Sequence, residues 1–164
     1  MDVIDGLLRI KRVREESREA EMRRARQHLE TAAEALRRAK QSQQERDQER
    51  TDRERTLYEE VCARTVVVRE LDDLKWKIGV MKDEAKADAQ AVVDAQTQRQ
   101  TRRDAFDEAT STWQLAAQAK QRFEDLAAER AEARAKHAEW LAELELEEHP
   151  ARSPLADAMD LEEA

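Results

Sequence analysis

Glycine, proline, cysteine and aromatic residues are all scarce in this sequence of 164 residues. It contains two glycines, two prolines and one cysteine, and only 4% of its residues are aromatic. After Gly6 the only glycine is Gly79, and the first proline is Pro150. Because glycine and proline are the residues that most often interrupt a helix, nearly the whole chain before Pro150 is free to be helical.

The residues that build catalytic and metal sites are missing as well. Two glycines cannot form a glycine-rich phosphate loop. The histidines, His28, His137 and His149, have no second ligand at the spacing of a metal site, and we expect His137 to lie in a helix interface. Cys62 cannot form an intramolecular disulfide, which favours a reducing cytosol, and we expect it to be a buried or inert thiol. The sequence therefore predicts a protein that is not an enzyme and needs no cofactor.

Charge and hydropathy exclude two further classes of protein. No stretch approaches the roughly 18 consecutive apolar residues of a membrane span. The net charge is −8, but residues 141–164 hold eight acids and one base, whereas residues 1–140 hold 30 acids and 29 bases. Nucleic-acid binding requires a net basic face, which this distribution does not provide. We therefore expect neither membrane insertion nor nucleic-acid binding.

The second half of the chain has the pattern of a coiled coil. Charged residues make up 41% of the sequence, which is typical of long helices. From Leu71 onward, mostly apolar residues recur in alternate steps of three and four, the period of a coiled-coil seam. The seam positions are Leu71, Leu74, Ile78, Met81, Ala85, Asp88, Val92, Ala95, Arg99, Arg102, Phe106, Ala109, Trp113, Ala116, Lys120, Phe123, Ala127, Arg130, Arg134, His137, Leu141 and Leu144.

The first half carries a matching apolar stripe with one long gap. The stripe consists of Met22, Ala25, Leu29, Ala32, Leu36, Ala39 and Leu57. Between Lys40 and Thr56 there is no apolar residue. This polar stretch is either a solvated helix held by charge pairs four residues apart, or a polar surface or flexible point that a partner uses.

The chain is expected to reverse direction at the β-branched run 65–68, where helix propensity is low; Gly79 is the alternative. We therefore predict an all-α fold in which two long helices form an antiparallel coiled-coil hairpin over residues 1–148. Helix one spans about 3–63, the turn about 64–68 and helix two about 69–147, followed by an acidic disordered tail over 149–164. This register puts Leu8 near Phe123 and leaves roughly the last 15 to 20 residues of helix two beyond helix one.

Four segments carry a family resemblance. They are Leu7–Glu15, Arg46–Glu60, Val67–Leu74 and the Glu- and Leu-rich Trp140–Glu148. In these segments the chain resembles the FliJ/YscO-type proteins, small stalk components of flagellar and virulence type III secretion systems. The resemblance covers most of residues 7–148.

The resemblance implies a monomeric hairpin that stands in the central pore of the hexameric secretion ATPase, promotes ring assembly and ATP hydrolysis, and links the ring to the export gate and to secretion chaperones. It would be cytoplasmic, peripheral at the cytoplasmic face of a secretion apparatus. ATPase contacts are expected at the helix ends, on Leu8, Arg9, Lys11, Arg12, Arg14, Trp140 and Glu143. Contacts with the cytoplasmic domain of the export gate are expected near the turn, on Arg50, Leu57, Tyr58, Leu71 and Leu74.

Two other functions stay open on the sequence alone. A purely structural coiled coil would form a stable dimer without a motor partner. A chaperone-binding adaptor would need an exposed apolar groove for its clients. Trp76 and Trp140 fall just off the seam, and exposed tryptophans are enriched in binding surfaces, so both are candidates for partner contacts.

Overall fold

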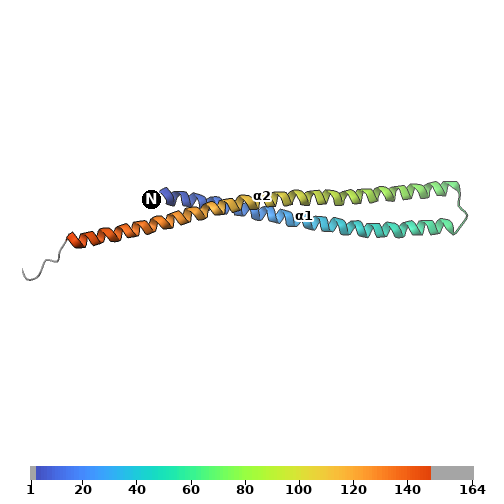
Figure 1. Cartoon of the computed structure of the whole chain (residues 1–164). Coiled ribbons are helices and arrows are strands. Elements are labelled where there is room, and N and C mark those ends of the chain that lie inside the picture. Colours follow the sequence, from blue (N-terminus) through green and yellow to red (C-terminus); the bar gives the residue numbers. More distant parts are fainter. Residues whose placement is uncertain (1–2, 149–164) are drawn as a thin grey trace, which may run out of the picture. The chain divides into compact units, whose positions relative to one another are not determined.

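The computed structural model of the chain describes residues 3–148, which form two long helices joined by a short turn. Helix α1 is Val3–Cys62 and helix α2 is Val68–Glu148. The two helices run in opposite directions side by side (Figure 1), so the predicted antiparallel helical hairpin is confirmed. The contacts divide into two compact units, one of Glu16–Leu115 and one that combines Met1–Glu15 with Ala116–Ala164.

In the unit Glu16–Leu115, the core is the narrow seam between the helices. Leu36 on α1 and Leu74 on α2 are each 8% exposed, and Met81 is 7% exposed. Further seam positions of this unit are partly buried: Met22, Ala25, Leu29, Ala32, Ala39, Leu57, Ile78, Ala85, Asp88, Val92, Ala95, Phe106, Ala109 and Trp113. Arg99 and Arg102 also follow the 3.5-residue period but are exposed. Leu71, the first apolar position of the period, is 38% exposed; the other apolar members form the core, as the pattern predicts.

The turn follows the end of α1 at Cys62 and precedes the start of α2 at Val68. The backbone N–H of Val67 donates to the Glu70 carboxylate at 3.1 Å, and the N–H of Glu70 donates to the Val67 carbonyl at 2.9 Å. The first of these bonds is one half of a capping box and the second is a backbone turn bond; both satisfy N–H groups that a helix start leaves without partners. Gly79, the alternative site of reversal, lies inside α2. Cys62 is exposed rather than buried, because it is the last residue of α1 and lies where the described chain enters the turn.

In the unit that combines Met1–Glu15 with Ala116–Ala164, the start of α1 packs on α2. Leu8 is 8% exposed, and the Lys11 ammonium lies 5.2 Å from the centre of the Phe123 ring, a cation–π contact. Lys120 pairs with Glu15 at 3.5 Å. Phe123 on α2 thus contacts Lys11. The expected neighbour on α1 was Leu8, which lies about one helical turn before Lys11.

Helix α2 continues beyond its packed part in this unit (Figure 1). Ala127 is the last seam residue that is partly buried before a fully exposed stretch, residues 128–143. His137 lies in this stretch, so the expected interface position is wrong. Among residues 3–148 no second helix covers it, and its ring instead lies 5.8 Å from that of Trp140. The predicted acidic tail, 149–164, lies outside the described residues.

Candidate functional site

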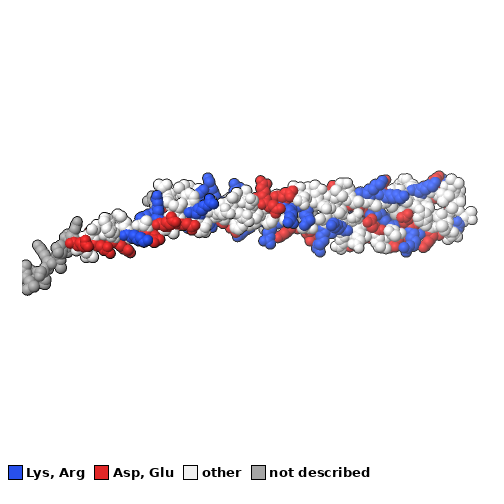
Figure 2. All heavy atoms as spheres, viewed as in Figure 1, with Lys and Arg blue, Asp and Glu red and all other residues white. Residues whose placement is uncertain are grey.

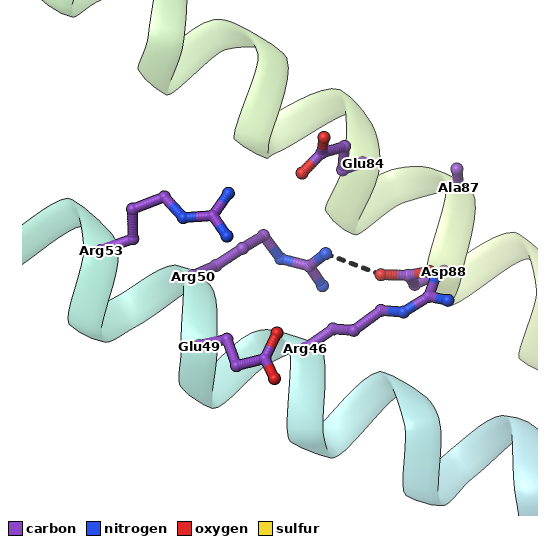
Figure 3. Close-up of a pocket in the computed structure, with 7 residues that line it drawn as sticks. All are labelled: Arg46, Glu49, Arg50, Arg53, Glu84, Ala87 and Asp88. Carbon is purple, nitrogen blue, oxygen red and sulfur yellow. Dashed lines mark hydrogen bonds and ion pairs between the residues drawn. The ribbon is translucent and has the colours of Figure 1, made fainter.

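The polar stretch of α1 is tied to α2 by a cluster of ion pairs. Arg46 and Arg50 reach across to the same carboxylate, that of Asp88, and each places one guanidinium nitrogen 2.6 Å from a carboxylate oxygen (Figure 3). Arg50 also pairs with Asp47 on its own helix. The side chains of Arg50 and Asp88 are each 12% exposed. The stretch without apolar residues is therefore a polar layer of the seam rather than a helix face held only by pairs within α1.

These contacts shift the pKa values of the paired groups. The hydrogen bond from Arg50, aided by that from Arg46, lowers the pKa of Asp88, while partial burial works in the opposite direction. The hydrogen bonds to Asp47 and Asp88 raise the pKa of Arg50. Both shifts favour the ionised forms, so Arg50 and Asp88 are charged at neutral pH. Since its charges satisfy one another, the cluster fits a structural role better than a catalytic one.

Beside this cluster, toward the turn, a shallow groove of about 330 Å³ lies between the helices. It is lined by Arg53, Leu57, Trp76, Lys77, Val80, Met81 and Glu84. Trp76 is 70% exposed, although a tryptophan buries more apolar area than any other side chain when it is covered. An exposed Trp at the rim of an apolar groove is typical of a protein-binding surface.

The residues expected to contact an export gate fall into two groups. Leu57 lines the groove, and Tyr58 and Leu71 are 46% and 38% exposed, so these three are accessible. Leu74 is buried in the seam, and Arg50 is engaged with Asp88. The binding role of all five residues stays a prediction. The positions of Leu74 and Arg50 suit them to support the surface rather than to touch a partner.

The residues expected to contact an ATPase all lie in the unit that combines Met1–Glu15 with Ala116–Ala164. Leu8 is buried, and Lys11 covers Phe123. Arg12 lies 3.3 Å from the carboxylate of Glu124. The other four members of the set are exposed: Arg9, Arg14, Trp140 and Glu143. Figure 2 shows acidic side chains gathered over the C-terminal end of α2.

The sequence did not reveal two exposed features of these surfaces. The groove beside Trp76 depends on how the helices pack. The only signal for it in the sequence was the position of Trp76 off the seam. Three apolar side chains near the start of α1, Leu7, Ile10 and Val13, are 39%, 49% and 59% exposed. Their signal in the sequence is apolar spacing on the face opposite Leu8, which is separate from the seam.

Over residues 3–148, no cluster of three or more His, Cys, Asp or Glu side chains is arranged to hold a metal ion. None of the described helices has a segment long and apolar enough to cross a membrane. The surfaces that the structure does present combine exposed apolar side chains with flanking charges, which is the composition of contacts between proteins.

Fold and surfaces thus define a class: a helical hairpin whose polar and apolar faces are suited to binding other proteins. The family model of the type III secretion protein YscO matches residues 4–151, and the chain belongs to this family. None of the curated proteins matches the chain. Its fold is similar to the crystal structure of the type III secretion protein YscO from Vibrio parahaemolyticus, with a TM-score of 0.78 and 21% sequence identity. The alignment covers 90% of this chain and 92% of that one.

Proposed function

We propose that this chain is the non-catalytic central-stalk component of a type III secretion system. In this role it inserts in the hexameric secretion ATPase, promotes assembly and activity of the ring, and couples the ring to the export gate and to secretion chaperones. Membership of the YscO family supports the setting. The roles of the individual residues rest on the surfaces described above.

The observation that carries the proposal is the exposed part of α2. Residues 128–143 are all exposed; Trp140 and Glu143 lie at the end of this segment, and Glu145, Glu147 and Glu148 follow it. A helix that leaves a Trp 52% exposed gains from a partner that covers it. Arg9 and Arg14, on the surface of the same unit, add positive charge. A ring with a pore lined by complementary charges would cover both features.

The export gate is proposed to bind near the turn, in the unit Glu16–Leu115. Leu57 and Trp76 line the groove, and Tyr58 and Leu71 are exposed. Replacing Tyr58 and Leu71 with Ala should weaken binding of the gate's cytoplasmic domain. Leu126→Ala, a change of similar size at a 44% exposed leucine of the other unit, should not.

The first experiment is to mix the purified chain with the secretion ATPase encoded beside it and to measure binding and the rate of ATP hydrolysis. The proposal expects a ring-shaped complex and faster hydrolysis. Both should be lost in Arg9→Glu/Arg14→Glu and kept in Lys75→Glu/Lys82→Glu, which makes the same charge change at exposed positions in the unit Glu16–Leu115. Failure of the unmodified chain to bind at micromolar concentration would instead favour a purely structural coiled coil.

A further inference from the structure

The first turns of α1 expose an apolar stripe beside basic side chains. Val3, Leu7, Ile10 and Val13 are 74%, 39%, 49% and 59% exposed. Steps of three and four residues place them along one face of the helix, away from the buried Leu8. Arg9 and Arg14 lie next to this face and are exposed. We call these six residues the basic stripe.

The end of α2, in the same unit, carries a stripe of the opposite charge. Trp140 and Leu141 are 52% and 43% exposed, and Leu144 follows on the same face. Glu143, Glu145 and Glu147 flank it and are exposed. We call these six residues the acidic stripe. Over the described part of the chain, no ion pair or hydrogen bond engages the side chains of these three glutamates, or those of Arg9 and Arg14 of the basic stripe.

The two stripes are opposite in charge, and the acidic stripe is about two-thirds as long as the basic one. Val3 to Val13 spans about 15 Å of helix, and Trp140 to Glu147 about 10 Å, at 1.5 Å per residue. Both offer aliphatic or aromatic side chains at spacings of three and four, the arrangement by which two helices interlock. When such faces meet, apolar area is removed from water and the flanking charges lie near opposite charges.

The stripes of one chain cannot meet while α2 stays helical. The start of α1 is held where Lys11 lies over Phe123 and Arg12 pairs with Glu124. Helix α2 is continuous to Glu148, so Trp140 lies about 25 Å further along its axis than Phe123. Val3 lies only about 12 Å beyond Lys11 in the same direction, which leaves about 13 Å of axis between the nearest ends of the two stripes. The acidic stripe is therefore out of reach of its own basic stripe, and a second copy of the chain can supply the missing partner.

We propose that two copies of this chain associate reversibly through these stripes. The basic stripe of each copy docks on the acidic stripe of the other, which makes a two-fold, self-complementary interface with two identical contacts. Each contact is small, so association falls in the micromolar range rather than that of an obligate dimer. The charges make it weaker as the salt concentration rises.

The dimer does not depend on the proposed function, but its formation would affect that function. Arg9, Arg14, Trp140 and Glu143 are exposed residues of the proposed ATPase surface, and the second copy covers all four. A chain in the dimer is therefore unable to enter the ring, so that self-association limits the supply of stalk. This limit on the supply of stalk rests on the proposed function.

The test is the mass of the full chain in solution, without any ATPase, by sedimentation equilibrium from micromolar to submillimolar concentration. The mass is expected to rise from that of the monomer, 19.1 kDa, toward twice that value, and less so in high salt. Arg9→Glu/Arg14→Glu should stay monomeric, as should Glu143→Arg/Glu147→Arg. Circular dichroism shows whether each variant keeps its helices.

Mixing the two variants gives the decisive result. In the mixed pair, the acidified stripe of one variant faces the basified stripe of the other, and the two unmodified stripes face each other. Association should therefore return in the mixture, to within a few-fold of the unmodified chain. A monomer at every concentration would overturn the proposal, as would a dimer that both variants retain or that the mixture fails to restore. ATPase activation is measured separately, so either proposal can fail alone.

Discussion

Arg50 and Asp88 meet across the two helices at 2.6 Å, in the stretch of α1 where the seam has no apolar residue to offer. Each side chain is 12% exposed, and Arg46 binds the other oxygen of the same carboxylate. Hydrophobic residues can slide past one another with little loss, but a partly buried ion pair tolerates one register only. We infer that this cluster fixes the alignment of α1 on α2 in the unit Glu16–Leu115.

Asp88→Asn should lower stability at neutral pH, because it removes the charge that Arg46 and Arg50 share. The pKa of Asp88 is lowered from 3.8 in the folded chain, so its ionisation stabilises the fold above that value. This contribution is lost as the pH falls through the lower, folded pKa. The gap between the unmodified chain and the variant should accordingly close in acid. Urea unfolding at a series of pH values measures it.

Asp83→Asn is the matched control for that experiment. Asp83 pairs with Lys86 on the surface of the same helix, and its side chain is 80% exposed. Exposed pairs of this kind contribute little, so its stability should stay close to that of the unmodified chain at every pH. An equal loss in the two variants would mean that the polar layer contributes no more than any surface pair.

Leu36→Ala should destabilise the chain by about 2 kcal/mol. The substitution truncates one of the most buried side chains of the chain and leaves a gap that the helices only partly close. Leu115→Ala makes the same chemical change in the same unit at a residue that is 63% exposed, and should cost much less. Chemical unfolding followed by circular dichroism gives both values. Equal losses would contradict the assignment of Leu36 to the core.

The two helices and their seam could be predicted because each depends on local pattern. Scarce glycine and proline predicted continuous helices, and the steps of three and four through Leu74 and Met81 identified the buried face. The β-branched run that ends at Val68 located the reversal. These signals need no knowledge of how distant residues meet.

The contacts of single side chains could not be predicted, because they depend on register and on where the opposite helix ends. Asp88 appeared only as a polar exception in the seam, and its partner Arg50 lay in a stretch with no pattern. His137 keeps the seam spacing, yet it is exposed because no second helix covers that part of α2. Burial at such positions is a property of the pairing, not of the local sequence.

Cys62 should react with a thiol reagent in the native protein about as fast as in the unfolded chain, because it is exposed at the end of α1. A buried comparison is Met81→Cys in a Cys62→Ser background, since Met81 is 7% exposed. That thiol should react much more slowly until denaturant is added. The measurement is the rate of release of a coloured thiolate. Slow labelling of native Cys62 would show that something covers the end of α1.

Gly79→Ala should stabilise the chain by about 0.5–1 kcal/mol, because glycine in a helix interior costs that much relative to alanine. Gly79 lies inside α2, and a Cβ added there would meet no atom within 4 Å, so the methyl group fits without rearrangement. Ala91→Gly, the reverse change at an exposed position of the same helix, should lower stability by a similar amount. Both are measured as shifts in the free energy of unfolding. A loss of stability in Gly79→Ala would mean that the chain needs the freedom of glycine there, and that α2 bends or opens at the position where the sequence offered its second site of reversal.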